Sequence, residues 1–371
     1  MSDLNFYRKY RPNKFEELLG QEVIKKVLKE SARRNDFNHA YLFSGPRGTG
    51  KTTTARLIAK TVNCKKRKQD KEFRQKGEPC RDCKACQKIE KGKSMDIIEI
   101  DAASNRGIDE IRNLKEDIKT PPSTSDFKVF IIDEAHMLTK SAFNALLKTL
   151  EEPPGYVILI LATTEPEKIP STISSRTQKF NFKKVPVREI KSKLKEISEA
   201  ENIEITQSAL ELIASSADGS FRDAESLLDQ LNSMEEGKII ASSVENLIGR
   251  VNFNKLSELV DKILENNLKD ALRLLNEIKK EGQDLSKLAK DLIKYLRKVA
   301  VMKSNENMKE VFQEELTDHQ VESIFEHSNK FQRKHLDLLK DLIEAYSQMR
   351  YSQFPIIPLE VAIIENLKRN S

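Results

Sequence analysis

The sequence contains no long apolar segment, and this absence argues against a membrane-spanning protein. The longest uninterrupted apolar run, Val157–Ala162, has six residues, whereas a membrane-spanning helix needs about 20. The first ten residues are polar and lack the apolar stretch of a secretory signal. We therefore expect a cytoplasmic protein with no membrane partner.

Proline is missing from 168 consecutive residues, Val187–Phe354, and only four glycines interrupt that stretch. Apolar residues recur there at three- and four-residue spacing, as in Leu268, Ala271 and Leu275. This spacing predicts helices with one apolar face. The C-terminal half should therefore be almost entirely helical.

Excess positive charge is confined to one segment. The chain carries a formal charge of +6, but residues 64–93 contain twelve Lys or Arg and five Asp or Glu, a net +7, so the other residues together carry −1. This distribution excludes a protein that binds nucleic acid over its whole surface. The segment can form a basic patch, although a solvated lysine-rich surface is the simpler interpretation.

Short apolar runs alternate with helix-like segments in the N-terminal half. Such alternation favours a parallel sheet covered by helices on both faces. The expected strands are His39–Phe43, Ile97–Ile100, Val129–Ile132, Tyr156–Ala162 and Lys179–Phe182, and the expected helices are Lys51–Val62, Gly107–Ile118 and Lys140–Glu151. The sequence therefore predicts an α/β domain with a five-stranded parallel sheet, followed by helical domains.

A phosphate-binding loop follows the first expected strand. The segment GPRGTGKT, Gly45–Thr52, matches the pattern GxxxxGKT between a strand and a helix. Glycines allow backbone N–H groups to converge on phosphate oxygens, and the helix N-terminus adds the positive end of a dipole. We expect Lys51 to reach the β- and γ-phosphates of a nucleotide and Thr52 to coordinate Mg²⁺. The predicted nucleotide-binding residues are Gly45, Pro46, Arg47, Gly48, Thr49, Gly50, Lys51, Thr52 and Thr53.

Two adjacent carboxylates end the third expected strand. In VFIIDEAH, Val129–His136, Asp133 is placed to hold Mg²⁺ and Glu134 to orient or deprotonate a water that attacks a phosphate. A helix start is the alternative, because Asp favours N-caps. The next strand ends in Thr163 and Thr164, and Thr164 is a candidate contact to the γ-phosphate or the water.

Two arginines lie beyond these strands. Arg176 belongs to the segment STISSRTQKF, and Arg222 belongs to the segment GSFRD. Each can neutralise phosphate charge. A surface salt bridge is the simpler interpretation of either arginine taken alone.

All four cysteines lie within residues 64–93, which we call the cysteine module. Cys64, Cys80, Cys83 and Cys86 have the spacing C-x15-C-x2-C-x2-C, and the histidines lie elsewhere in the sequence. A structural zinc site uses four tetrahedral nitrogen or sulfur ligands, and a cytosolic location argues against disulfides. We expect structural Zn²⁺, with an iron–sulfur cluster or free thiols as the alternatives.

Taken together, these motifs closely resemble the tau/gamma motor subunits of the bacterial DNA polymerase III clamp loader, a family of AAA+ ATPases. A phosphate loop is widespread, but a cysteine insertion directly after the phosphate-loop helix is far more discriminating. The resemblance runs essentially end to end and is carried by YRKYRPNKFEELLGQE (Tyr7–Glu22), HAYLFSGPRGTGKT (His39–Thr52), the four cysteines, DAASNRGIDEIR (Asp101–Arg112), FIIDEAHMLTKSAFNALLKTLEEPP (Phe130–Pro154), LATTEPEKIPSTISSR (Leu161–Arg176) and DGSFRDAESLLDQ (Asp218–Gln230).

The resemblance implies a fold, a reaction and partners. The implied fold is a P-loop AAA+ domain at residues 1–183, a helical lid at 184–245 and an all-helical oligomerising collar at 246–371. The implied reaction is ATP hydrolysis that opens a sliding clamp and places it on primed DNA during replication, with ATP, Mg²⁺ and Zn²⁺ bound. The implied partners are the delta and delta-prime subunits, other copies of the chain, the sliding clamp and primer–template DNA, within a nucleoid-associated replisome.

The resemblance also assigns roles to single residues. Arg176 matches an arginine finger that acts in trans on the ATP of a neighbouring subunit. Arg222 matches a sensor-2 arginine that acts in cis from the lid. Arg11 and Pro12 would pack near the adenine.

Three features depart from the family pattern. Thr177 replaces the cysteine that usually follows the finger arginine, and the Cys64–Cys80 spacing is longer than usual. Because Arg176 is retained, we expect its finger role to survive. The chain ends at Ser371 without the long extension of tau forms, as expected of a short form or a truncated chain.

Two other functions agree with parts of the sequence. A branch-migration helicase motor is also an AAA+ ATPase, but that class lacks the cysteine insertion and carries a winged helix after the lid. A non-catalytic scaffold subunit would have lost hydrolysis, and the intact Lys51, Thr52, Asp133 and Glu134 argue against that loss. The activity we expect is therefore that of an ATP-driven clamp-loader motor.

Overall fold

The computed structural model describes residues 5–369 except 105–113, 115, 236, 249–252, 314–315, 317 and 350. Most of the expected helix 107–118 and most of the motif 101–112 lie outside the described residues. The chain divides into two compact units, the first formed by Met1–Ile190 with Ala217–Ser226 and the second by Lys191–Ser216 with Leu227–Ser371. The expected three-domain division at 183/184 and 245/246 stays a prediction.

The first unit is built on a five-stranded parallel sheet, as expected. The strands follow the order β2-β3-β4-β1-β5, and every pairing is parallel. Each strand end lies within one residue of its expected position. The strands are β1 (Ala40–Ser44), β2 (Ile97–Asp101), β3 (Lys128–Asp133), β4 (Val157–Thr163) and β5 (Gln178–Asn181).

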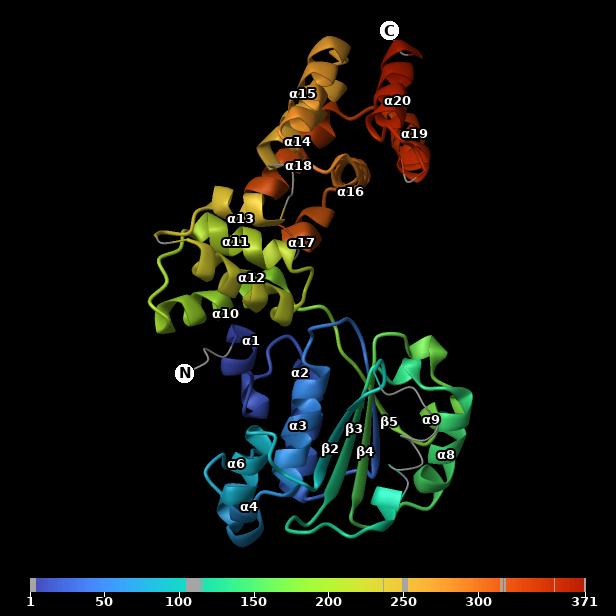
Figure 1. The fold of residues 1–371 in the computed structure, drawn as a ribbon. Helices are drawn as coiled ribbons and strands as arrows, with labels where there is room; N and C mark the ends of the chain where they lie inside the picture. The colour runs from blue at the N-terminus through green and yellow to red at the C-terminus, as the bar shows by residue number, and fades with distance from the viewer. Residues whose placement is uncertain are drawn as a thin grey trace. The chain divides into compact units, whose positions relative to one another are not determined.

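Helices cover both faces of this sheet because side chains alternate along its buried strands. On one face, Tyr41, Phe43 and Ile131 pack with α2 and α3, and on the other, Leu42 and Phe130 pack with α8 and α9 (Figure 1). The bounds of α3 and α8 are those expected from the sequence. The helices and 3-10 turns of this unit are α1 (Phe6–Lys9), η1 (Phe15–Glu17), α2 (Glu22–Arg34), α3 (Lys51–Val62), α4 (Lys65–Gln69), α5 (Lys71–Arg74), α6 (Lys84–Glu90), η2 (Ala135–Met137), α8 (Lys140–Glu151), η3 (Pro166–Lys168) and α9 (Ser171–Ser174).

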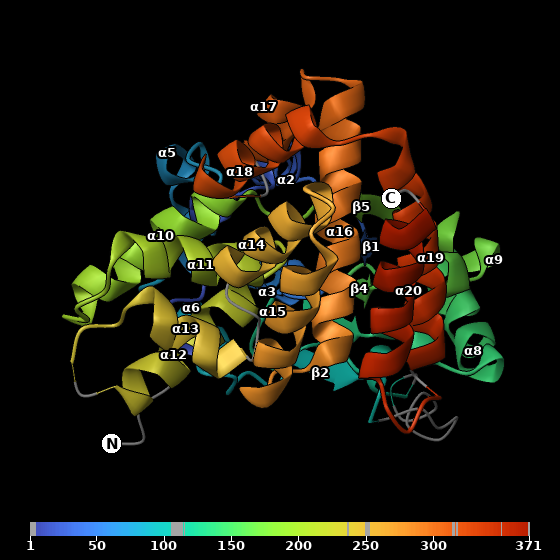
Figure 2. The same ribbon diagram turned by 90° about the horizontal axis from the view of Figure 1, so that it is seen from above.

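The second unit is helical over its described residues, with one isolated β-bridge between Ile205 and Ile239. Its C-terminal helices α15, α16, α19 and α20 lie side by side (Figure 2) around a buried core that includes Leu292, Leu338 and Leu359. Two helices, α10 (Val187–Ala200) and α12 (Phe221–Met234), contribute residues to both units. The other helices are α11 (Gln207–Ser216), α13 (Ala241–Ile248), α14 (Phe253–Leu264), α15 (Leu268–Lys280), α16 (Leu285–Ser304), α17 (Met308–Gln313), α18 (Asp318–Lys330), α19 (Arg333–Met349) and α20 (Ile356–Arg369).

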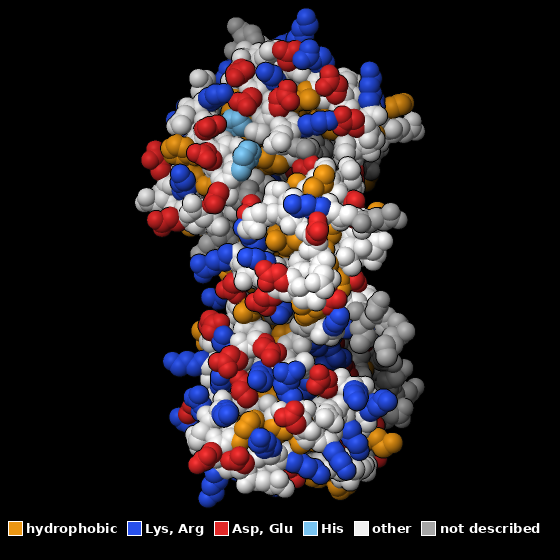
Figure 3. Space-filling view, turned by 90° about the vertical axis from the view of Figure 1, so that its left-hand side faces the viewer, with side chains coloured by type: hydrophobic (Ala, Val, Ile, Leu, Met, Phe, Trp, Pro, Cys, Tyr) orange, Lys and Arg blue, Asp and Glu red, His pale blue; other side chains and the backbone are white. Residues whose placement is uncertain are grey.

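The surface carries charges of both signs. Lys and Arg side chains are interspersed with Asp and Glu side chains on the face seen in Figure 3. Exposed ion pairs contribute about 0–1 kcal/mol each, so burial of the apolar cores is the main source of stability in both units. Among the described residues, no helix is both long enough and apolar enough to cross a membrane.

Candidate nucleotide site and cysteine cluster

The parallel order of the strands brings three predicted motifs to one edge of the sheet. β4 lies between β1 and β3, with Ser44 beside Thr163 and Ile132 beside Leu161. The carboxyl ends of parallel strands lie at the same edge. The loops that follow β1, β3 and β4 therefore meet there, although Ser44 and Thr163 are far apart in the sequence.

The phosphate loop, Gly45–Thr52, depends on glycine at two close contacts. Gly45 and Gly48 have φ angles of +138° and +72°, which side chains rarely adopt. A Cβ atom on Gly45 would lie 2.3 Å from the carbonyl oxygen of Phe182, and one on Gly48 would lie 1.9 Å from Ser220 Oγ. The loop is therefore tightly turned, and Phe182 and Ser220 pack directly against it.

Lys51 begins α3 and folds back over the loop. Its Nζ donates to the carbonyl oxygens of Gly45 and Pro46, at 2.7 Å each, and the residue is only 6% exposed. Burial lowers the pKa of Lys51, while the carboxylates of Glu134 and Asp133 oppose that effect. An ammonium group held here is placed to neutralise an anion bound at the loop.

Thr52 and Asp133 form the contact between the phosphate loop and β3. Thr52 Oγ1 donates to Asp133 Oδ2 at 2.7 Å, and Asp133 Oδ1 accepts the backbone N–H of Glu134 at 3.0 Å. Hydroxyl and carboxylate oxygens are the ligands that Mg²⁺ prefers. This pair therefore fits a magnesium site at the edge of the sheet.

Glu134 is held at the same edge by the end of β4. Its backbone is left-handed, with φ +48°, and its Oε2 accepts a hydrogen bond from Thr164 Oγ1 at 3.2 Å. His136 Nδ1 lies 3.6 Å from the same oxygen and 3.0 Å from Thr163 Oγ1. Thr164 thus contacts the carboxylate suited to act on water, whereas Thr163 is buried behind it.

Two neighbours of the site have no assigned role in the sequence-based prediction. His136 lies inside the DEAH segment, but its contacts to Thr163 and, through Nε2, to Glu165 at 3.1 Å depend on the neighbouring strand. Ser220 precedes α12, and its Oγ accepts the backbone N–H of Asp223 at 3.2 Å. Its N-cap role is readable from the sequence, but its packing on Gly48 is not.

Arg222 lies at the start of α12 beside the phosphate loop. The backbone N–H of Phe221 donates to the carbonyl oxygen of Gly48 at 3.1 Å, and the Cβ of Arg222 lies 3.4 Å from the position of a Cβ on Gly48. The Arg222 guanidinium carbon lies 5.0 Å from the centroid of the Tyr7 ring. The structure therefore brings Arg222 next to the loop within the first unit.

Arg176 contacts residues of α8 and α9 rather than the phosphate loop. Its guanidinium pairs with Glu151 Oε1 at 2.8 Å and donates to the carbonyl oxygen of Thr172 at 2.8 Å. The side chain is 38% exposed, and Thr177 Oγ1 donates to the carbonyl oxygen of Ser174 at 3.2 Å. These contacts lie around α8 and α9 and leave part of the arginine open to solvent.

The remaining predicted nucleotide-binding residues differ in burial. Thr49 is buried, and its Oγ1 donates to the carbonyl oxygen of Pro46 at 2.8 Å. Arg47 is exposed, and Thr53 is half-buried in the first turn of α3. Arg11 and Pro12 are half-buried in the segment between α1 and η1.

The four cysteines converge as expected. Their Sγ atoms all lie within 4.8 Å of one another, and Cys80 and Cys86 are 4.0 Å apart. Tetrahedral bonds of about 2.3 Å separate sulfur ligands by about 3.8 Å, so the cluster fits one zinc ion. The residues between Cys64 and Cys80 form α4 and α5, and the long spacing therefore does not prevent convergence.

Hydrogen bonds already favour a thiolate in this cluster. A hydrogen bond from Cys86, together with others from backbone N–H groups, lowers the pKa of Cys64 to about 5 despite burial. The N–H of Cys80 donates to Cys64 Sγ at 3.3 Å, and the N–H of Cys83 donates to Cys80 Sγ at 3.3 Å. The hydrogen bond to Cys64 raises the pKa of Cys86, and burial raises that of Cys80, so the preference for a thiolate is not shared by all four thiols. Four sulfur ligands would leave no open position on a bound zinc ion, so the site is structural in type.

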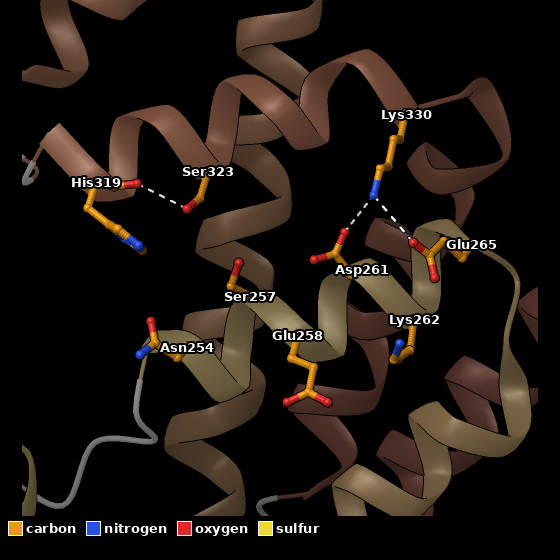
Figure 4. A pocket seen from close by; sticks show the side chains of 9 residues that line it. All are labelled: Asn254, Ser257, Glu258, Asp261, Lys262, Glu265, His319, Ser323 and Lys330. Carbon is orange, nitrogen blue, oxygen red and sulfur yellow. Dashed lines mark hydrogen bonds and ion pairs between the residues drawn. The ribbon is translucent and has the colours of Figure 1, made fainter.

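A polar hollow in the second unit lies between α14 and α18 (Figure 4). Lys330 Nζ lies 2.8 Å from Asp261 and 3.3 Å from Glu265, and His327 Nε2 lies 3.1 Å from Asp261. Burial raises the pKa of Asp261, but hydrogen bonds from Lys330 and His327 bring it below its usual value. These groups pair with one another, and we assign no ligand to the hollow.

The fold and the site together define a class of protein. A phosphate loop follows β1, acidic residues end β3, and β4 lies between these two strands in a parallel sheet. Helical regions follow the sheet in the chain. This arrangement is that of an AAA+ P-loop protein.

Comparison with known proteins identifies the family. Three family models match in succession, described as "DNA polymerase III, delta subunit" at residues 20–186, "DNA polymerase III clamp loader subunit, ATPase lid domain" at 189–234, and "DNA polymerase III subunits gamma and tau domain III" at 239–369. The gamma subunit of DNA polymerase III from Buchnera aphidicola is 38% identical over 87% of this chain and 87% of its own length. The chain belongs to the gamma/tau subunit family of DNA polymerase III.

Two further comparisons describe the extent of the likeness. The tau subunit of Bacillus subtilis is 42% identical over 98% of this chain, which spans 63% of that subunit's length. A solved structure of the RuvB branch-migration motor from Thermotoga maritima aligns with a TM-score of 0.46 and 20% identity, over 69% of this chain and 79% of its own.

We expect Gly48→Ala to destabilise the first unit more than Gly92→Ala. Both residues have positive φ, but a Cβ on Gly92 meets nothing within 4 Å, whereas one on Gly48 would collide with Ser220. The left-handed backbone alone costs an alanine about 1–2 kcal/mol, and overpacking adds about 1–3 kcal/mol. Denaturant unfolding of both variants would measure the difference, and equal losses would contradict the packing of Ser220 on Gly48.

Proposed function

We propose that the chain is an ATP-binding and ATP-hydrolysing motor subunit of the replicative clamp loader. The observation that carries this proposal is the meeting of Lys51, the Thr52–Asp133 pair and the Glu134–Thr164 pair at one edge of the sheet. Lys51 supplies a cation, Thr52 and Asp133 supply metal ligands, and Glu134 supplies a base. Phosphoryl transfer to water requires these groups close together. Membership of the gamma/tau family supports clamp loading as the purpose of hydrolysis.

Each group has a separate task in the proposed reaction. The loop N–H groups and Lys51 bind and neutralise the phosphates, and Lys51 exchanges the carbonyl oxygens of Gly45 and Pro46 for phosphate oxygens. Thr52 and Asp133 would hold Mg²⁺, which would supply positive charge to neutralise the phosphates. Glu134 orients the attacking water and accepts its proton, while Thr164 fixes the direction of that carboxylate.

Membership of the gamma/tau family supports a proposed assembly. The chain would act with further copies of itself and with the delta and delta-prime subunits, and would open the sliding clamp and place it on primer–template DNA in the cytoplasmic replisome. Arg11 and Pro12 would contact the adenine. We further propose that the cysteine cluster binds structural Zn²⁺, because the sulfur spacing fits one tetrahedral ion.

Phosphate release by the purified chain, with and without primed DNA and the partner subunits, tests the motor function. We expect Lys51→Ala to abolish nucleotide binding and clamp loading, because it removes the buried cation of the phosphate loop. Glu134→Gln should bind ATP normally and hydrolyse it at least about 10²-fold more slowly, because it keeps the shape and loses the base. The exposed Glu167→Gln should behave as the wild type.

Two outcomes would redirect this proposal. Loss of ATP binding in Glu134→Gln would make Glu134 a structural residue. Normal ATP binding with no phosphate release by the wild-type chain, even in the full assembly, would favour the scaffold subunit.

Arg176→Ala and Arg222→Ala should have different defects. If Arg176 acts in trans, its loss leaves ATP affinity intact and slows hydrolysis in the assembly by about 10³–10⁵-fold. Arg222 lies beside its own phosphate loop, so Arg222→Ala should weaken the nucleotide response within one subunit. Mixing Arg176→Ala chains with Lys51→Ala chains, and measuring hydrolysis against the mixing ratio, distinguishes action of Arg176 in trans from action in cis. If Arg176 acts in trans, hydrolysis depends on which neighbour supplies the arginine. A defect that stays with the mutated chain, whatever its neighbours, would refute the interfacial role.

Metal analysis of cytosolically expressed protein should find one zinc per chain. Cys83→Ser should lose most of that zinc, because a hydroxyl is a far poorer ligand than a thiolate. Iron in place of zinc, or a metal-free chain, would overturn the assignment.

A further inference from the structure

Residues 5–21, which we call the N-terminal strap, touch the nucleotide site at several points. Leu18 Cδ2 lies 3.9 Å from the position of a Cβ on Gly50 in the phosphate loop. Asn13 Oδ1 accepts a hydrogen bond at 2.6 Å from Lys60 Nζ on α3, the helix that Lys51 begins. Tyr7 stacks with Arg222. The position of the strap therefore affects the loop, its helix and Arg222 together.

A buried carboxylate from the cysteine module holds the middle of this strap, and Arg81 of the module lies 3.9 Å from Glu17 of the strap. Glu78 Oε2 accepts the backbone N–H of Phe15 at 2.7 Å, and Oε1 accepts that of Glu16 at 3.0 Å. The residue is 6% exposed, and Lys29 Nζ on α2 lies 3.2 Å from Oε1. Phe15 and Glu16 begin η1, so their N–H groups have no acceptor within that turn. Glu78, about sixty residues further along the chain, provides the acceptor oxygens.

The backbone of the module is fitted to α2 and α3 around this carboxylate. A Cβ on Gly77 would lie 2.6 Å from the carbonyl oxygen of Lys29 on α2, so Gly77 lets the chain pass directly against that helix. The buried Arg67 donates to the carbonyl oxygens of Ala32 and Thr61. Cys86 Sγ lies 3.9 Å from the carbonyl oxygen of Lys60. The module lies beside α3 (Figure 1).

The interior of the module depends on its thiols. Its buried cluster consists of Cys64, Cys80 and Cys86, with Phe73 and Cys83 packed against it. A cluster of this size cannot fold a segment of about thirty residues by apolar burial alone, and small modules of this kind are usually held by a metal. Glu78 lies between Gly77, which contacts α2, and Cys80, so the order of the cysteine cluster contributes directly to where Glu78 is held.

We propose that the cysteine module positions the N-terminal strap against the phosphate loop through Glu78, and that metal binding at the cysteines is thereby coupled to nucleotide binding. Glu78 is a positioning residue in this scheme. The coupling is reciprocal, so bound nucleotide should also strengthen metal binding. The inference rests on the proposed function to the extent that the phosphate loop binds ATP.

The test measures the dissociation constant of a fluorescent ATP analogue, together with the zinc content, for the wild type and three variants, each carrying all 371 residues. Glu78→Gln has one acceptor oxygen where two are needed, so it should keep one zinc per chain and bind the analogue about tenfold more weakly. Glu72→Gln is the matched control, because Glu72 is an exposed residue of the same module, and it should bind as the wild type does. Lys51→Ala should not bind.

The outcomes separate the inference from the proposed function. If the wild type and Lys51→Ala both fail to bind the analogue, the proposed function fails. If the wild type binds and Glu78→Gln binds equally well, the positioning role of Glu78 is wrong.

Hydrogen exchange of the wild-type chain before and after zinc removal gives a second test that needs no variant. The amides of Phe15 and Glu16 should exchange at least about tenfold faster once the zinc is removed, because they lose their hydrogen bonds to the Glu78 carboxylate. The amides of β3 should be unaffected and serve as the internal reference. Strap amides that stay as protected as before would overturn the coupling, even if Glu78→Gln does not fold.

Discussion

The parallel pairing of β1, β4 and β3 is the constraint on which the candidate site depends. It sends the phosphate loop, Glu134 and Thr164 to one edge of the sheet, although each follows a different strand. There is no room for a side chain at Gly45 or Gly48, because Phe182 packs against the first and Ser220 against the second. Sheet order and glycine packing together fix where a phosphate can bind.

Polar groups at this edge are paired with one another. Lys51 donates to loop carbonyls, Thr52 donates to Asp133, and Thr164 donates to Glu134. A buried polar group without a partner costs about 1–3 kcal/mol, so these pairs stabilise the fold. Ligand binding at this edge is then an exchange of hydrogen bonds, and its net free energy is the difference between the old partners and the new ones.

The sequence predicts local features well and distant contacts poorly. The strands, the bounds of α3 and α8 and the convergence of the cysteines follow from apolar periodicity, a helix-start signal and ligand spacing, all of which are local patterns. The order of the strands, the packing of Ser220 on Gly48 and the hydrogen bonds of Glu78 to η1 depend on which segments meet in three dimensions. No periodicity marks Glu78 among the other charged residues of its segment.

The contact of Gly77 with α2 sets a rule for how the cysteine module can vary among relatives. Gly77 is fixed against the Lys29 carbonyl, and Cys80 is fixed in the cluster, so the residues between them have a set length. Before Gly77, Arg67 is also fixed by its hydrogen bonds to the carbonyl oxygens of Ala32 and Thr61, and Phe73 packs against the cysteine cluster. Between Arg67 and Phe73 the chain can change length at little cost in entropy. Insertions and deletions should therefore accumulate between Arg67 and Phe73 and be absent between Gly77 and Cys80, which would keep Glu78 in register while the segment before it changes size.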